Sequence, residues 1–222
     1  MYQNYAVIFD VDGVLADTGP IHYQSWVKMA NEIGKTFTKS FFEATFGKQS
    51  VPITRELVGI NEDQNLVEKW AQQKEKYYRE IVKDKIRPLP GVINLIKNLK
   101  SVNFKLAVGS SGPLDNVKLL LSSLKIDLFF DAIITAEDIQ NGKPSPDVFL
   151  LAAQIIKVKP QNCLVIEDAP VGVEAANKAN MKCIALTTTH DIDVLRSADI
   201  IVKDLSYVSV KSIIDLLNPK TQ

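Results

Sequence analysis

The sequence lacks a net charge, a long apolar run and an abundance of cysteine. Its 26 basic residues balance its 26 acidic residues, so no overall positive field argues for binding to nucleic acid or to an anionic membrane. No apolar stretch approaches the roughly 20 residues of a membrane span, and the N-terminus does not carry a basic segment followed by a long apolar one. We therefore expect a cytoplasmic protein with neither nucleic acid nor membrane as a partner.

The sequence offers few residues for cysteine chemistry. The sequence has two cysteines, and Cys163 and Cys183 each fall in an apolar, strand-like run, which indicates buried, reduced thiols. A catalytic thiol would need a histidine beside it, and the two histidines, His22 and His190, lie in other segments. Thiol catalysis is therefore not expected.

What the chain of 222 residues does have is an alternation of short apolar runs with helical patterns. Runs rich in β-branched residues predict strands at 6–9, 105–108, 132–134, 163–166, 183–186 and 200–202. One-sided apolar spacing predicts helices at 92–99, 117–124, 145–156, 171–179 and 209–217. The third of these helices is expected to have Ser145 as its N-cap and Pro146 in its first turn. The alternation predicts an α/β fold, a Rossmann-like parallel sheet with helices on both faces.

One stretch breaks this alternation. Between about residues 20 and 87 the sequence shows only helical patterns, at 21–33, 39–46, 53–57 and 62–83. Turn-forming residues mark where the stretch leaves and rejoins the rest, at 17–20 and at Pro88, Pro90 and Gly91. We therefore predict an all-helical cap domain at residues 19–87, inserted into a core domain made of residues 1–18 and 88–222.

Asp10 and Asp12 follow the first predicted strand, two positions apart. Side chains at this spacing on an extended chain point to the same side, so both carboxylates can face one ligand. An ionised Asp10 can attack a phosphoryl group while Asp12 protonates the leaving oxygen, and two charges this close need a cation. The alternatives are a polar turn or a fragment of a calcium-binding loop, but no further ligand follows Gly13 at the spacing of such a loop.

Ligands of a parallel sheet bind beyond the carboxyl ends of its strands, so the residues after the other predicted strands are candidates too. Ser110 and Ser111, flanked by glycines, offer hydroxyl and amide donors to a phosphate oxygen. Lys143 lies between Gly142 and Pro144, and its ammonium can reach a phosphoryl group and Asp10. Each has a plainer interpretation as well, because Ser-Gly turns are common and most lysines are solvated.

Glu167 and Asp168 end an otherwise apolar strand, where acidic side chains are unfavourable unless they are paired or bind a metal. Asp168 and Asp10 together make a hard oxygen site suited to Mg²⁺, although an acidic strand end can also be the start of a simple loop. Each of these signals is modest by itself. Their placement after successive strands predicts one composite site.

These motifs resemble the haloacid dehalogenase superfamily, and within it the sugar-phosphate phosphatases and the β-phosphoglucomutase-like branch with a helical cap. The resemblance covers nearly the whole chain. The first motif matches residues 10–18, the second Ser110, the third Lys143 in Gly-Lys-Pro-Ser-Pro-Asp, and the fourth 167–168. The resemblance implies Asp10 as nucleophile, Asp12 as general acid and base, and Ser110 and Lys143 as phosphate ligands. It also implies Mg²⁺ held by Asp10, the backbone carbonyl of Asp12 and Asp168, with Glu167 nearby.

The two aspartates are expected to differ in protonation. Asp10 has an unperturbed pKa of about 3.9, which a cation lowers, so we expect it to be ionised at neutral pH. Asp12 must begin the reaction with a proton and lose it later, so its surroundings must differ from those of Asp10. We expect the cap to supply this difference by excluding water.

The cap is expected to choose the acceptor of the phosphoryl group. His22 and Trp26 share one face of the first cap helix and match a His and a Trp of β-phosphoglucomutase, and Lys74 matches a cap Lys. Packing or solvation is the plainer interpretation of each. The cap loop that contains Lys48 lacks the Arg that is typical of the mutase branch, so we favour a phosphatase. The candidate substrate contacts of the cap are therefore His22, Trp26, Lys48 and Lys74.

Three hypotheses remain. The first is a magnesium-dependent phosphatase that acts on a small sugar phosphate or similar metabolite through an aspartyl-phosphate intermediate. The second is a phosphomutase of the β-phosphoglucomutase type, in which a second sugar hydroxyl replaces water. The third is a non-catalytic binding module on the same fold. A monomer or small homo-oligomer is expected in each case.

Overall fold

The computed structural model describes residues 2, 4–82 and 85–218. Six strands of this part form one parallel sheet in the order β3-β2-β1-β4-β5-β6. They are β1 (Ala6–Phe9), β2 (Lys105–Gly109), β3 (Ala132–Ile134), β4 (Cys163–Glu167), β5 (Lys182–Leu186) and β6 (Ile200–Val202). In the register of the sheet Phe9 pairs with Val108 and Ile166, so β1, β2 and β4 end side by side.

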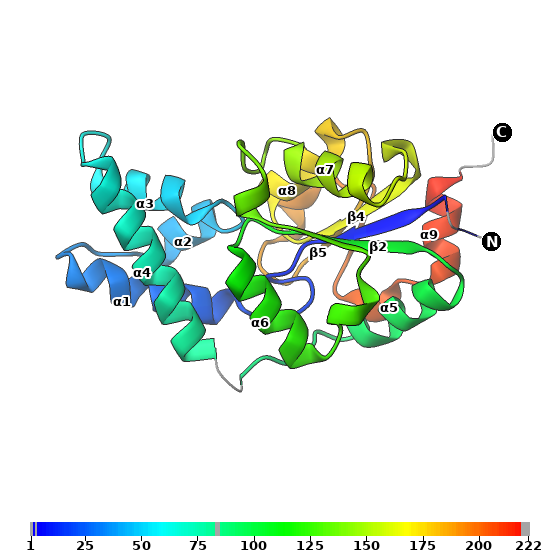
Figure 1. Ribbon diagram of the computed structural model, residues 1–222, viewed down its shortest axis with the longest axis horizontal. Helices are drawn as coiled ribbons and strands as arrows, with labels where there is room; N and C mark the ends of the chain where they lie inside the picture. The colour runs from blue at the N-terminus through cyan, green and yellow to red at the C-terminus, as the bar shows by residue number, and fades with distance from the viewer. Residues whose placement is uncertain (1, 3, 83–84, 219–222) are drawn as a thin grey trace.

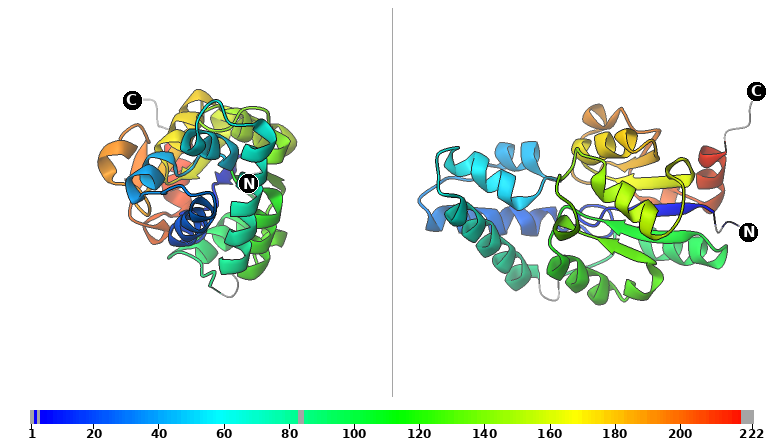
Figure 2. Two further views of the ribbon diagram at one scale, coloured as in Figure 1. Left: turned by 90° about the vertical axis from the view of Figure 1, so that its left-hand side faces the viewer. Right: turned by 45° about the horizontal axis from the view of Figure 1, so that its top comes forward.

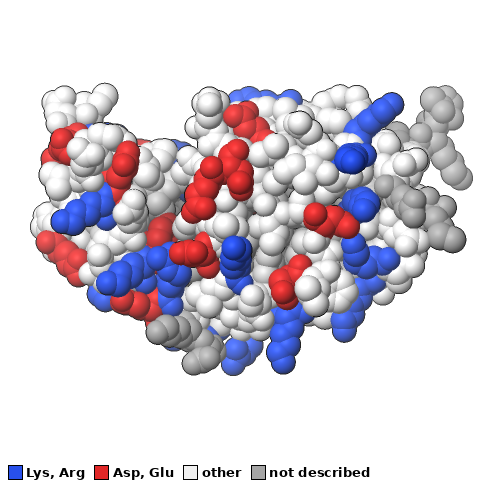
Figure 3. Space-filling view, in the orientation of Figure 1, with Lys and Arg blue, Asp and Glu red and all other residues white. Residues whose placement is uncertain are grey.

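Helices cover both faces of this sheet (Figure 1). One face carries α5 (Val92–Ser101), α6 (Leu114–Leu124) and α9 (Val210–Leu217), and the other carries α7 (Asp147–Ile155) and α8 (Pro170–Lys178). On the face that Figure 3 shows, both acidic and basic side chains are present. The predicted α/β class with a Rossmann-like parallel sheet is confirmed.

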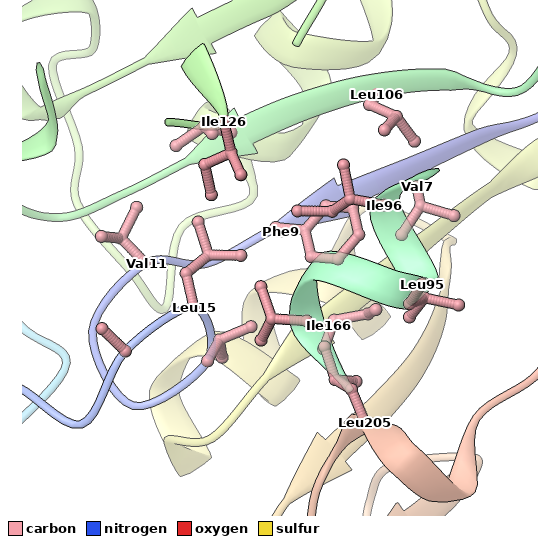
Figure 4. Close-up of a cluster of buried hydrophobic side chains, with 14 of the residues drawn as sticks. Val7, Phe9, Val11, Leu15, Leu95, Ile96, Leu106, Ile126, Ile166 and Leu205 are labelled. Atoms are coloured by element: carbon pink, nitrogen blue, oxygen red, sulfur yellow. The ribbon is translucent and has the colours of Figure 1, made fainter. Parts of the chain in front are cut away.

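The central strands are buried on both sides, because successive side chains of a strand point to opposite faces. Val7 and Phe9 belong to the larger apolar cluster, with Ile166, Leu95 and Ile96 (Figure 4). The alternate residues of β1, Ala6 and Ile8, pack into a second cluster under α7 and α8. Burial on both faces explains why these strands are almost continuously apolar, and why the first polar residue after each is noticeable.

Cys163 and Cys183 are free and buried, as predicted. The predicted cap of α7 was wrong: the helix begins at Asp147, Pro146 occupies the N-cap position, and the Ser145 hydroxyl donates to the Asp147 carboxylate at 2.5 Å. Ser145 therefore lies one residue before the N-cap position, and no side chain caps the backbone of this helix. Among the described residues, no helix is both long and apolar enough to cross a membrane.

Gly91 is a backbone position that only glycine fits. Its φ is +84°, and a Cβ there would lie 2.2 Å from the backbone carbon of Leu205. We expect Gly91→Ala to lower the free energy of unfolding by about 2–4 kcal/mol, measured by urea denaturation. Gly34→Ala is the matched control, because Gly34 also has a positive φ, +67°, but open space around it. Equal losses in the two variants would contradict the steric argument.

Helices α1 (Gly19–Glu32), α2 (Lys39–Thr45), α3 (Ser50–Val58) and α4 (Gln64–Val82) form a separate helical part at one end of the molecule (Figure 2). It has its own apolar cluster, which includes Trp26, Met29, Phe37, Ile53 and Tyr77. These helices follow the four predicted helical patterns, although Lys83, the predicted end of the last, lies outside the described residues. The domain boundaries at 18/19 and 87/88 stay a prediction.

Candidate active site

The carboxyl ends of β1, β2 and β4 bring the predicted site residues together. Asp10 directly follows β1, Ser110 follows β2, and Glu167 is the last residue of β4. All three are buried, as are Lys143 and Asp168. Because the strands are parallel and end in register, side chains from segments far apart in the sequence meet at one edge of the sheet.

Lys143 is the centre of this cluster. Its Nζ donates to Asp10 Oδ1 at 2.6 Å and to Glu167 Oε1 at 2.6 Å. Burial alone would lower the pKa of Lys143, but the charges of Asp10 and Glu167 outweigh burial and raise it above its ordinary value. The lysine is therefore a permanent cation, fixed beside the carboxylate that was predicted to attack phosphorus.

Asp10, Glu167 and Asp168 form a group of carboxylates able to hold a metal. One oxygen from each lies within 4.8 Å of the others. Glu167 Oε2 accepts from the amides of Asp168 and Ala169, at 2.8 and 3.0 Å, whereas the Lys143 ammonium donates to Asp10 and Glu167. Hard oxygen donors with an excess of negative charge fit Mg²⁺. The Asp12 side chain is not in this group, so its predicted contribution through the backbone carbonyl stays a prediction.

Burial changes the expected ionisation of Asp10. Desolvation, only partly offset by Lys143, raises its pKa to about 7, so without a cation it is incompletely ionised at neutral pH. Burial and the charge of Glu167 raise the pKa of Asp168 as well. The expectation of an ionised Asp10 neglected burial, which the sequence does not display. A bound divalent cation would restore the charged forms.

A stability measurement tests this electrostatic account. Because Asp10 binds its proton more tightly in the folded than in the unfolded chain, the metal-free protein loses stability as pH rises from about 4 to 7, by on the order of 2 kcal/mol between pH 5 and 7. Mg²⁺ competes with these protons, so we expect it to raise the melting temperature more at pH 8 than at pH 5.5. An equal shift at both pH values would contradict the assignment, and Asp10→Asn should remove most of the difference.

Ser110 and Ser111 lie beside this cluster. Ser110 is buried, and its Oγ accepts from the Gly112 amide at 3.0 Å, which leaves its hydroxyl hydrogen available to a phosphate oxygen. The Oγ of Ser111 is buried and has no hydrogen-bond partner among the residues that the structure describes. Both hydroxyls line the same small pocket as Asp10 and Asp12. Their role as phosphate ligands remains a prediction.

Asp12 is turned away from the carboxylate group and toward the helical part. Its Oδ1 accepts from Thr18 Oγ1 at 2.5 Å and lies 3.0 Å from His22 Nε2. Burial would raise the pKa of Asp12, but its pairing with His22, the Thr18 hydrogen bond and the charge of Lys74 outweigh burial and lower it to about 2. In this arrangement Asp12 is ionised. The expectation that it carries a proton when the reaction begins concerns the substrate-bound enzyme and stays a prediction.

His22 connects Asp12 to α4. Lys74 Nζ lies 2.8 Å from His22 Nδ1, and because an ammonium can only donate, Nδ1 accepts while Nε2 donates to Asp12. The imidazole also stacks on the Tyr78 ring at 4.0 Å. The Lys74 ammonium lies 5.0 Å from the centre of the Trp26 ring. His22 and Trp26, which were predicted to share one helix face, therefore both line the small pocket.

Lys48, the fourth predicted cap residue, lines the same pocket and lies 3.8 Å from Glu56. The pocket as a whole has a volume of about 40 Å³. A water needs roughly 10–15 Å³ on this scale. There is room for a phosphoryl group but not for a whole sugar phosphate.

Direct contacts hold the helical part against the sheet domain. Asn116 of α6 donates to Glu75 Oε2 at 2.6 Å and accepts from Arg79 at 2.9 Å. On the other side of the site, His190 Nε2 lies 3.1 Å from the Glu43 carbonyl oxygen. Sequence reasoning missed Thr18, Glu75 and Asn116. Of these three residues, only Thr18 could have been predicted, because it lies within the first sequence motif.

Comparisons with known proteins place the chain in a family. A family model described as haloacid dehalogenase-like hydrolase matches residues 7–186. The phosphorylated carbohydrates phosphatase of Thermotoga maritima is 32% identical over 183 residues, which is 81% of this chain and 83% of that protein. The β-phosphoglucomutase of Bacillus subtilis is 31% identical over 214 residues, which is 93% of this chain and 92% of that protein.

A solved structure extends the likeness to the whole arrangement. That of β-phosphoglucomutase from Clostridium difficile matches with a TM-score of 0.89 at 31% identity, and the match covers 96% of this chain and 97% of that one. The resemblance drawn from the four motifs is confirmed. Since the family match runs from β1 to the end of β5 and includes the helical part, the chain belongs to the haloacid dehalogenase-like hydrolases.

Proposed function

We propose that this enzyme is a magnesium-dependent phosphatase that hydrolyses a small sugar phosphate or a similar phosphorylated metabolite through a phosphorylated Asp10. The observation that carries the proposal is the buried pairing of Asp10 with Lys143, 2.6 Å apart, beside two further carboxylates. Relatives named as phosphatases of phosphorylated carbohydrates and of fructose 1-phosphate support the substrate class.

In the first step an Asp10 oxygen attacks phosphorus and the bond from phosphorus to the alcohol oxygen breaks. Lys143 holds Asp10 in place and offsets charge on the transferring group. Ser110 and Ser111 orient it with their hydroxyls. When bound by Asp10, Asp168 and the Asp12 carbonyl, Mg²⁺ would neutralise negative charge on the phosphoryl oxygens.

Asp12 handles the protons in both steps. A phosphate group that enters beside it raises its pKa, because a second negative charge favours the protonated form. Asp12 therefore takes up a proton from solvent as the substrate binds, and then gives this proton to the leaving alcohol oxygen. In the second step it takes a proton from the water that attacks the phosphorylated Asp10, and the bond between Asp10 and phosphorus breaks to release phosphate.

A phosphomutase is the second candidate, favoured by the structural likeness to β-phosphoglucomutase and by the contact of His22 with Lys74. It differs only in the acceptor, because a second hydroxyl of the sugar replaces water. The loop at 47–52 offers Lys48 and Gln49 but no Arg to hold a second phosphate. We therefore rank it below the phosphatase, with a non-catalytic module third.

One experiment separates the three candidates. The purified protein is incubated with Mg²⁺ and a panel of sugar phosphates that includes β-glucose 1-phosphate, with and without glucose 1,6-bisphosphate. Free phosphate and glucose 6-phosphate are measured together. We expect phosphate release without an isomer. An isomer that appears only with the bisphosphate would establish the mutase instead, and no turnover on any ester would contradict both enzymatic proposals.

A further inference from the structure

A larger pocket adjoins the small one at the junction of the two parts of the molecule. It has a volume of about 400 Å³, within the range of pockets that hold small molecules. Ser50, Glu75 and Ser111 line both pockets, so the two are neighbours with a shared wall. A phosphate ester whose phosphoryl group occupies the small pocket therefore has this space for the rest of its body.

Neutral polar groups of the larger pocket suit hydroxyl groups. Gln49 and Gln72 contribute amides, and Ser50 and Ser111 contribute hydroxyls. The Ser111 Oγ has no partner among the described residues although it is buried. An unsatisfied hydroxyl at the boundary between two pockets is costly unless a ligand satisfies it. A substrate hydroxyl or the ester oxygen meets that need.

The charged groups of the larger pocket are mostly acidic. Glu75, Asp115 and Glu137 line it, against Arg79 as the one basic side chain among its described lining residues. Glu75 is paired with the Lys74 ammonium at 2.9 Å, so Asp115 and Glu137 are the acids that carry the negative charge of this pocket. The Arg79 guanidinium already donates to Asn116 at 2.9 Å. In Figure 3 acidic side chains gather at the junction of the helical part and the sheet domain on the face toward the viewer. Carboxylates accept hydrogen bonds from hydroxyls but repel a second phosphate.

From this charge pattern we infer that the larger pocket holds the alcohol part of the substrate and selects polyhydroxyl monophosphates against bisphosphates. The inference rests on the proposed phosphatase function and narrows it. It also gives a physical reason to rank the mutase second, because a mutase must accept a sugar bisphosphate in the same site.

The test compares matched esters: fructose 1-phosphate with fructose 1,6-bisphosphate, and glucose 1-phosphate with glucose 1,6-bisphosphate. Turnover is measured with the wild-type protein and Mg²⁺, and binding by calorimetry with Asp10→Asn. At low salt we expect the monophosphate of at least one pair to be favoured by about tenfold or more, both in kcat/KM and in affinity. The preference should shrink at 0.5 M salt, because salt screens exposed charges.

Variants connect the preference to the pocket. The double variant Asp115→Asn with Glu137→Gln keeps the shape of both side chains and removes their charge, so we expect the ratio of monophosphate to bisphosphate turnover to fall at least threefold. Asp215→Asn is the control, since Asp215 is exposed on α9, away from both pockets. It should leave the ratio unchanged.

The outcomes separate this inference from the proposed function. Phosphate release with equal or better use of bisphosphates, or a ratio that the double variant does not change, would overturn the inference and leave the phosphatase intact. The inference would also be overturned if none of the four esters bound to Asp10→Asn and none was hydrolysed by the wild-type protein. If no ester of the wider panel were hydrolysed either, the proposed phosphatase function would be contradicted as well.

Discussion

Replacing Asp10 with Asn is expected to reduce phosphate release by about 10⁴-fold or more, the scale of losses seen when a nucleophile is removed. The amide keeps the size of the side chain but has no carboxylate to attack phosphorus. Asp10 also belongs to a group of three buried acids, of which it and Glu167 share the Lys143 ammonium. Removal of its charge therefore relieves repulsion, and the variant should be at least as stable as the wild type without metal.

Loss of activity in Asp10→Asn has two possible causes, a missing nucleophile and a weakened metal site, and Asp168→Asn distinguishes them. Asp168 lies in the same carboxylate group but is not placed to attack in our proposal. We expect high Mg²⁺ concentrations to restore part of the activity of Asp168→Asn and none of that of Asp10→Asn. Equal recovery in both variants would contradict the nucleophile assignment.

Acid quenching gives a direct measurement. Wild-type protein mixed with a labelled phosphate ester should carry label on the peptide that contains Asp10, and Asp10→Asn should carry none. Asp215→Asn serves as the control for handling and folding, because its side chain is exposed on α9. Label on another residue, or more than about 1% residual activity in Asp10→Asn, would contradict the mechanism.

The sequence predicted the sheet well because its central strands are buried on both faces. Such strands must be apolar throughout, so Asp10, Ser110 and Glu167 are visible as polar residues at strand ends. Helix starts were less well predicted. The N-cap of α7 falls on Pro146, one residue after Ser145, and a shift of one residue at a helix end is not resolved by sequence spacing.

The electrostatics of the site could not be predicted from sequence. Asp10 and Asp12 are separated by one residue, yet burial raises the pKa of the first to about 7 and its partners lower that of the second to about 2. The difference comes from Lys74 and His22, which approach Asp12 from α4 and α1. The sequence marks His22 and Lys74 as candidate residues, but it does not show that both act on the pKa of Asp12.

Replacing Asp12 with Asn should separate the two steps of the reaction. The Asn Oδ1 can still accept from Thr18 and His22, as Asp12 does now, so the cap contact and the fold should survive. Proton transfer is lost, which slows hydrolysis of an alkyl phosphate by about 10²–10⁴-fold. With p-nitrophenyl phosphate the leaving group needs no proton, so the first step should be much less affected than the second.

Rapid mixing of Asp12→Asn with p-nitrophenyl phosphate should then give a burst of nitrophenol close to one equivalent per enzyme, followed by slow turnover. The burst follows because phosphorylated Asp10 accumulates when no base activates water. His22→Gln should behave differently: it keeps the Asp12 carboxylate but removes the imidazole that lowers its pKa to about 2. The acid limb of its pH-rate profile should move to higher pH, since burial then dominates. An absent burst in Asp12→Asn, or an unmoved acid limb in His22→Gln, would show that the proton is handled elsewhere.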